Sequence, residues 1–119
     1  MRRLPEILAE RRLDGNGAAS GVELELRVPA DLEYFAGHFP GAPVLPGVVQ
    51  LDWCLRLARE RLGLAGHFRG MEQIKFLAPI GPDAQVTLRL EMRPGGEKLS
   101  FGFFVDSKKH SSGTLLFGA

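Results

Sequence analysis

The chain has 119 residues, of which 45% are hydrophobic and 24% charged, and its formal net charge is +1 at pH 7. This length fits one globular domain with a core and is too short for two, so we expect residues 1–119 to form a single domain. The balance of 15 basic and 14 acidic residues leaves no strong electrostatic footprint for nucleic acid. The single cysteine, Cys54, excludes an internal disulfide and suits a reducing cytoplasm.

The first segment of the chain, residues 1–13, combines Leu4, Ile7 and Leu8 with charged side chains. This pattern predicts a short amphipathic N-terminal helix. The segment has no uninterrupted apolar core, so it is not expected to be a secretory signal. No run in the chain approaches the roughly 18 apolar residues that crossing a bilayer requires. We therefore expect a cytoplasmic protein with no membrane partner.

The remaining pattern predicts one helix and an antiparallel sheet. Residues 21–29 alternate apolar and charged side chains, which is typical of a strand with one face in water. After a loop over 30–46, apolar residues recur at helical spacing from Val48 to Leu62. Segments of strand character follow, with a hairpin tip expected at 107–110. These segments cover residues 68–80, 84–92, 99–106 and 111–117.

The predicted helix has an apolar stripe that is expected to face the core. Cys54 falls within the stripe, so we interpret it as a buried packing residue rather than a reactive thiol. Asp52 lies at the border of the stripe, where a carboxyl is either partly solvated or desolvated. The stripe consists of Val48, Leu51, Cys54, Leu55, Ala58 and Leu62.

The most informative segment is residues 37–51, which read Gly-His-Phe-Pro-Gly-Ala-Pro-Val-Leu-Pro-Gly-Val-Val-Gln-Leu and bring Asp52 fourteen positions after His38. The prolines and glycines between these two residues exclude a helix there, so a stiff turn is expected to hold His38. At the helix start, Gly47 lies where backbone N–H groups have no intrahelical partner. A histidine base, free N–H donors and a carboxylic acid together predict dehydration of a hydroxyacyl thioester.

This string, followed by Asp52, resembles the β-hydroxyacyl-ACP dehydratase family of hotdog-fold proteins. A second segment, residues 75–83, is similar to the family's Lys-Phe, Pro and Gly-Asp pattern. Roughly residues 20–119 can be laid on one such domain. The resemblance implies an α+β hotdog fold, in which a curved antiparallel sheet wraps around a long central helix.

The resemblance also assigns roles to residues. His38 matches the family's catalytic histidine, and Asp52 matches its acidic residue, which is aspartate in the branch that also isomerises the product. Gly47 and Val48 match the positions whose N–H groups hold the thioester oxygen. Aspartate by itself does not identify an isomerase. Aromatic residues around the motif are candidates for the wall of an acyl pocket, although such residues are more often simple core: Tyr34, Phe35, Phe39, Trp53 and Phe76.

Arg56 departs from the family, which usually carries glutamine four residues after the acid. Asp52 and Arg56 are neighbours at i and i+4 on a helix, so one interpretation is that the arginine pairs with the aspartate and keeps it ionised. This would hinder Asp52 as a general acid and makes Arg56 a candidate modulator. The other interpretation is that Arg56 points to solvent and leaves Asp52 in the pocket.

The resemblance implies a homodimer, or an assembly of such dimers, in which each site takes histidine from one protomer and the acid from the other. It implies a substrate carried on the phosphopantetheine of an acyl carrier protein or on coenzyme A, with no metal, nucleotide or redox cofactor. If the carrier is acidic, basic residues are candidates to dock it: Arg59, Arg61, Lys108 and Lys109.

Three alternatives stay open at this point. A thioesterase of the same fold would use a helix carboxylate to direct water at the carbonyl, but it has little use for His38. A catalytically inactive partner of a heterodimer would bind the acyl carrier without turnover, and Arg56 makes this conceivable. The third alternative keeps the chemistry and places it in a specialised polyene, aryl polyene or polyketide pathway rather than in general fatty-acid synthesis.

Overall fold

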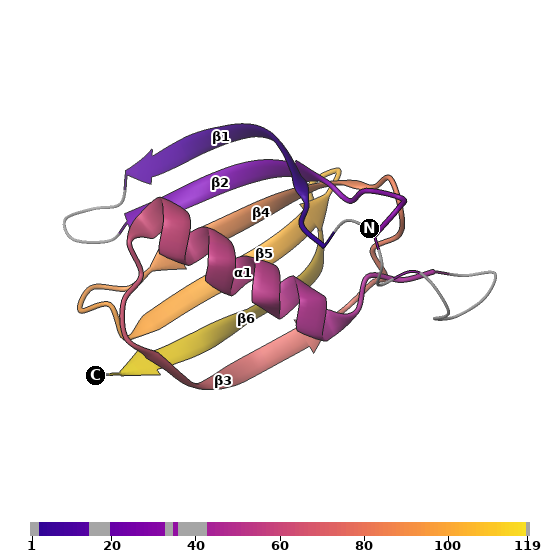
Figure 1. Cartoon of the computed structure of the whole chain (residues 1–119). Helices are drawn as coiled ribbons and strands as arrows, with labels where there is room; N and C mark the ends of the chain where they lie inside the picture. Colours follow the sequence, from indigo (N-terminus) through magenta and orange to yellow (C-terminus); the bar gives the residue numbers. More distant parts are fainter. Residues whose placement is uncertain (1–2, 15–19, 33–34, 36–42, 119) are drawn as a thin grey trace.

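The computed structural model describes residues 3–14, 20–32, 35 and 43–118. One helix lies against one face of a curved six-stranded sheet (Figure 1). The elements are β1 (Glu6–Asp14), β2 (Ser20–Arg27), α1 (Gly47–Leu62), β3 (His67–Phe76), β4 (Gln85–Met92), β5 (Lys98–Val105) and β6 (Lys108–Gly118). The strand order is β1-β2-β4-β5-β6-β3, and every neighbouring pair is antiparallel. The predicted α+β architecture is confirmed.

The core lies between α1 and the sheet. On β2 and just after it, Val22, Leu24, Leu26 and Val28 are all fully buried, while the charged residues between them face away. The alternation read from residues 21–29 therefore predicted the correct face, because successive side chains of a strand point to opposite sides of the sheet. β4 repeats the pattern with apolar residues at alternate positions, and its register with β2 aligns the two buried rows.

Pro46 and Gly63 mark the two ends of α1. Pro46 is its N-cap, where a missing N–H costs nothing, and Gly63 ends it in the left-handed conformation (φ 64°). The buried face differs from the predicted stripe, because Val48 is 75% exposed. The first turns of α1 carry apolar residues on several sides, so packing against the sheet, not periodicity, selected the face. The buried residues of α1 are Val49, Gln50, Trp53, Cys54, Leu57 and Ala58.

Cys54 is fully buried in this core, as predicted for a packing residue. Burial raises the pKa of its thiol well above the ordinary value, because the apolar surroundings disfavour the thiolate. The residue is therefore a small apolar side chain in function, and it offers no nucleophile at neutral pH.

The predicted N-terminal helix over residues 1–13 is wrong. Glu6–Asp14 forms strand β1, which pairs with β2 at one edge of the sheet. Side chains reinforce this pairing: Arg11 Nη2 donates to Glu23 Oε1 at 2.9 Å, and Arg27 forms an ion pair with Glu6. A short charged segment forms a marginal helix when it stands alone, whereas pairing with the open edge of β2 gives its backbone hydrogen-bond partners along its length. The tertiary pairing therefore overrides the local amphipathic pattern.

The hairpin between β5 and β6 is shorter than predicted. Its two central residues are Asp106 and Ser107, with φ values of 49° and 67°, whereas residues 107–110 were expected at the tip. Two positive φ values match the twist of a two-residue hairpin. The lysines after the turn therefore belong to β6. No helix in the described part of the chain is long and apolar enough to cross a membrane.

Candidate active site

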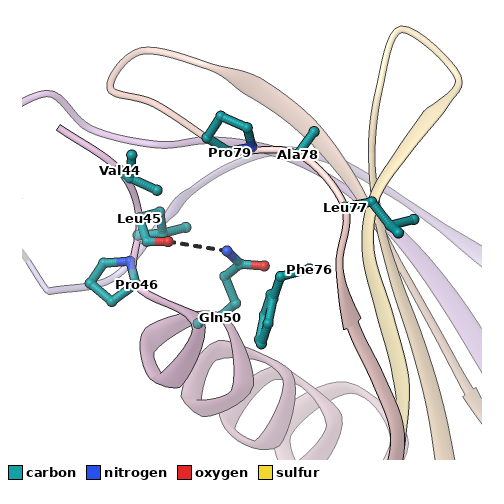
Figure 2. A pocket seen from close by; sticks show the side chains of 9 residues that line it. Val44, Leu45, Pro46, Gln50, Phe76, Leu77, Ala78 and Pro79 are labelled. Carbon is teal, nitrogen blue, oxygen red and sulfur yellow. Dashed lines mark hydrogen bonds between the residues drawn. The ribbon is translucent and has the colours of Figure 1, made fainter. Parts of the chain in front are cut away.

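A pocket of about 470 Å³ opens beside the start of α1. Its lining includes the turn at 44–46, and Gly47 and Gln50 of α1. It also includes Phe76 at the end of β3 and the three residues that follow it, 77–79 (Figure 2). Leu45 N–H donates to Ile80 O at 2.7 Å, which holds the turn against the segment that follows β3. Among the described residues that line the pocket none is charged, so this part of it suits an apolar ligand with a polar group at the helix start.

The helix start supplies backbone donors to this pocket. The N–H groups of Val49 and Gln50 both donate to Pro46 O, each at 3.1 Å. Within the described residues, the N–H groups of Gly47 and Val48 have no backbone acceptor, as the geometry of a helix start dictates. Gly47 borders the pocket. These two predicted oxyanion donors therefore lie at the helix start, next to the pocket, with the positive end of the helix dipole behind them.

Phe76 forms one wall of the pocket and lies over Gly47. A Cβ added at Gly47 would come within 2.6 Å of the Phe76 ring, so only glycine permits this contact. Phe76 is 52% exposed and was predicted, with other aromatic residues, as a candidate for the wall of the acyl pocket. The structure brings Phe76 and Gly47 together across about thirty residues of sequence, and both line the same pocket.

Of the other predicted pocket residues, the structure describes Trp53 and Phe35, and neither is among the residues that line this pocket. Trp53 is fully buried in the core, where its Nε1–H donates to Arg3 O at 3.0 Å, and it does not line the pocket beside Gly47. Phe35 is partly buried against the core. Tyr34, His38 and Phe39 lie outside the described residues.

Asp52 and Arg56 form an ion pair, with Arg56 Nε donating to Asp52 Oδ2 at 2.8 Å. Of the two interpretations left open, the structure has the paired one. Both side chains are substantially exposed, at 44% for Asp52 and 59% for Arg56. Asp52 does not line the pocket beside Gly47, so a single chain does not bring the predicted acid to the predicted oxyanion donors.

The four basic residues predicted to dock a carrier divide into two pairs. Arg59 donates to Leu64 O and Gly66 O, at 3.4 and 3.3 Å, and so caps the end of α1. Arg61 lies 3.6 Å from Glu10 in an ion pair with β1. Lys108 and Lys109 are exposed at the start of β6, and the next residue, His110, accepts hydrogen bonds at its carbonyl from the N–H groups of Leu77 and Ala78 on the pocket rim.

Sequence reasoning missed Gln50. Its side chain is 3% exposed and lines the pocket, with Nε2 donating to Leu45 O at 3.1 Å and Oε1 accepting from Ser111 Oγ at 2.7 Å. A polar residue between Val49 and Leu51 at the helix start was the available signal. In the part of the chain that the structure describes, no cluster of three His, Cys, Asp or Glu side chains is arranged to hold a metal ion.

A sheet-wrapped helix whose first turn opens on an apolar pocket defines a hotdog-fold protein. Residues 14–114 match the family model described as ApeI-like, ApeI dehydratase. The chain belongs to the ApeI-like dehydratase family. This confirms the hotdog fold and the dehydratase class that the motif around His38 predicted.

Known proteins agree with this assignment. The chain is 31% identical to the 3-hydroxyacyl-[acyl-carrier-protein] dehydratase FabZ of Chlamydia trachomatis serovar L2, over 97% of this chain and 83% of the relative. A solved structure of an uncharacterized protein from Erwinia carotovora subsp. atroseptica is 37% identical with a TM-score of 0.88, covering 97% of this chain and 96% of that one. The dehydratase heterocomplex ApeI:P from Xenorhabdus doucetiae matches at 26% identity and a TM-score of 0.83, over 97% and 98% of the chains.

Replacing Gly47 by alanine is expected to lower both stability and dehydratase activity. The new Cβ would come within 2.6 Å of the Phe76 ring, so this half-exposed side chain must turn away, at a cost of at most about 1 kcal/mol, the low end of what overpacking costs in a core. Thermal unfolding and enoyl formation measure the two effects. The double variant Gly47→Ala/Phe76→Leu relieves the overlap and is expected to recover most of the lost stability. A double variant as unstable as Gly47→Ala alone would contradict the ring contact.

Replacing Arg56 by glutamine is expected to raise the dehydration rate, because it releases the Asp52 carboxyl from its ion pair. An exposed pair contributes at most about 1 kcal/mol, which corresponds to a rise of up to about fivefold in kcat. Steady-state enoyl absorbance measures it. Arg93→Gln, an exposed arginine in the turn after β4, is the matched control and should leave kcat unchanged. A fall in kcat for Arg56→Gln would show that the pair serves catalysis.

Proposed function

We propose that this protein removes water from 3-hydroxyacyl thioesters carried on an acyl carrier protein and releases trans-2-enoyl thioesters. The observation that carries the proposal is the apolar pocket that begins at Gly47, beside N–H donors that no backbone oxygen of the described residues occupies. The His-Phe-Pro-Gly segment lies immediately before this turn in the sequence. Family membership and the similarity to FabZ proteins support the same reaction.

In the proposed reaction, His38 takes the proton from the carbon next to the thioester carbonyl. Negative charge then develops on the carbonyl oxygen, and the N–H groups of Gly47 and Val48 stabilise it. The bond between the β-carbon and its hydroxyl breaks, and Asp52 supplies the proton with which the hydroxyl leaves as water. The reaction requires no metal, nucleotide or redox cofactor, and the phosphopantetheine arm belongs to the carrier.

We further propose that the working form is a homodimer joined along β3. The two edge strands of the sheet differ: β1 carries Glu6, Glu10, Arg11 and Arg12, and charges of this kind discourage pairing with another strand. β3 carries charged residues as well, but it leaves larger apolar side chains in water, at 43% exposure for Phe68, 50% for Met71 and 52% for Phe76, against 37% for Ile7 and 44% for Leu8 on β1. Among the described residues only β6 pairs with β3, so its other side is open to a second copy.

Such a dimer would complete the site. Asp52 does not reach the pocket of its own chain, whereas β3 ends at Phe76, the wall of that pocket. A second copy paired along β3 would bring its own α1 toward this end of the sheet, and with it a second Asp52. The Asp52–Arg56 ion pair would then separate or rearrange as the carboxyl enters a shared pocket.

The pair also supports a second candidate function. Arg56 engages the Asp52 carboxylate, which does not line the pocket, and a chain that keeps this arrangement would act as an inactive partner that binds the acyl carrier without turnover. The heterocomplex among the structural relatives shows a dehydratase assembled from two different chains. We also propose a cytoplasmic location and a place in general fatty-acid synthesis or in a specialised polyene, aryl polyene or polyketide pathway.

Enoyl formation from 3-hydroxyacyl thioesters tests the reaction. We expect the wild-type protein to form enoyl product and His38→Ala to lose at least about a hundredfold in kcat, since general-base catalysis contributes about 10²–10⁴. Released thiol is measured in parallel. Thiol release without enoyl formation would identify a thioesterase, and tight carrier binding without turnover would identify an inactive partner. Equal rates for wild type and His38→Ala would overturn the role of His38.

Subunit complementation tests the shared site. His38→Ala and Asp52→Asn are each expected to be inactive, but their random mixture should recover about a quarter of the wild-type activity, because half of the dimers are mixed and each holds one intact site of two. The mixture is prepared by co-expression with two tags, and enoyl formation is measured. A mixture as inactive as either parent would show that His38 and Asp52 belong to the same protomer's site.

A further inference from the structure

Gln50 is the polar side chain that α1 buries beside the pocket. Each end of its amide makes a hydrogen bond: Nε2 donates to Leu45 O at 3.1 Å, and Oε1 accepts from Ser111 Oγ at 2.7 Å. Figure 2 shows the amide reaching from the helix to the carbonyl of Leu45, with Phe76 beside it. A buried amide left without partners is costly, so both bonds constrain where the side chain lies.

The bond to Leu45 falls at the point where the helix start most needs support. Pro46, the N-cap, has no backbone N–H and no capping side chain, so the turn lacks the usual local tie between a cap residue and the first helical turn. Leu45 is instead held on both sides, through its N–H to Ile80 O at 2.7 Å and through its carbonyl to Gln50. Two residues later come Gly47 and the free N–H donors.

The bond to Ser111 extends this support to the sheet. Ser111 is fully buried on β6, directly opposite Phe76 of β3 in the strand register. Gln50 therefore links the three elements that form the pocket: the turn before α1, the helix itself and the β3–β6 pair that carries Phe76. An apolar side chain at position 50 would fill the same space but would remove this hydrogen-bonded link between the turn and β6.

We propose that Gln50 is a positioning residue that fixes the turn at Leu45 and Pro46, so that the N–H groups of Gly47 and Val48 converge on one point of the pocket. This inference rests on the proposed function for its effect on rate. Donors that stabilise a developing charge act only when they are aimed before the reaction begins. A shift of about one ångström in such groups lowers a rate by about a hundredfold.

Kinetics of Gln50→Met test the inference, because methionine has a similar length and makes neither hydrogen bond. We expect kcat to fall by about ten- to a hundredfold while KM changes less than about twofold, since the lost interaction acts on the transition state. Ser111→Ala removes one bond only and should lower kcat less. The double variant Gln50→Met/Ser111→Ala should be no slower than Gln50→Met, because the two residues act through one bridge.

Leu90→Ala is the control for a merely destabilising change. Leu90 is fully buried on β4 outside the pocket lining, so this variant should lose stability and keep its kcat. The inference would be overturned if Gln50→Met kept the wild-type kcat. It would also be overturned if Leu90→Ala, at equal loss of stability, lowered kcat as much as Gln50→Met does. A double variant in which the two losses multiply would overturn it as well.

Amide hydrogen exchange separates this inference from the proposed function. In Gln50→Met the Leu45 N–H should exchange at least about tenfold faster than in wild type, while Leu90→Ala should show no excess change at Leu45 beyond its global loss of stability. If the wild-type protein is inactive but Gln50→Met still speeds exchange at Leu45, the proposed reaction is refuted while the role of Gln50 in holding the turn stands. Unchanged exchange at Leu45 would overturn the positioning role even in an active enzyme.

Discussion

The structure depends on how the first turn of α1 is held against the end of the sheet. A helix must begin with N–H groups that its own backbone cannot satisfy, and here Gly47 and Val48 carry them at the edge of an apolar pocket. Because Pro46 offers neither an N–H nor a capping side chain, the turn takes its support from Ile80 and Gln50. The same constraint makes glycine necessary under the Phe76 ring.

Within the described residues of one chain, the helix-start donors and Asp52 lie apart. The donors of the helix start lie at the pocket, whereas Asp52 lies on an exposed part of α1 in an ion pair with Arg56. The open edge of β3 and its apolar side chains lie next to the same pocket, so the surface that would bind a second copy adjoins the site that a second copy would complete. In the proposed dimer, assembly and chemistry would therefore be coupled through one end of the sheet.

Comparison of particular residues shows which predictions local sequence can support. The strand face at Val22 and Leu24 was predicted correctly, because alternation of apolar and charged residues leaves one possible buried side. The face of α1 and the state of residues 1–13 were not. Apolar residues surround the first turns of α1, and a short charged segment pairs with whichever edge is free, so in both cases a distant partner decides. Gln50 was missed because its partners, Leu45 and Ser111, meet only after folding.

By itself, the sequence determined the place of the helix start, because the proline and glycine pattern before Gly47 permits few backbone conformations. The fold class and the dehydratase family followed from the resemblance of residues 37–52 and 75–83 to known dehydratases, and the family match confirms them. Only the tertiary structure decided that Phe76 covers Gly47, that Gln50 ties the turn to β6, and that Asp52 pairs with Arg56 away from its own pocket. The physical reason is range: backbone restrictions act between neighbours in the chain, whereas side-chain contacts form between residues that the sheet brings together.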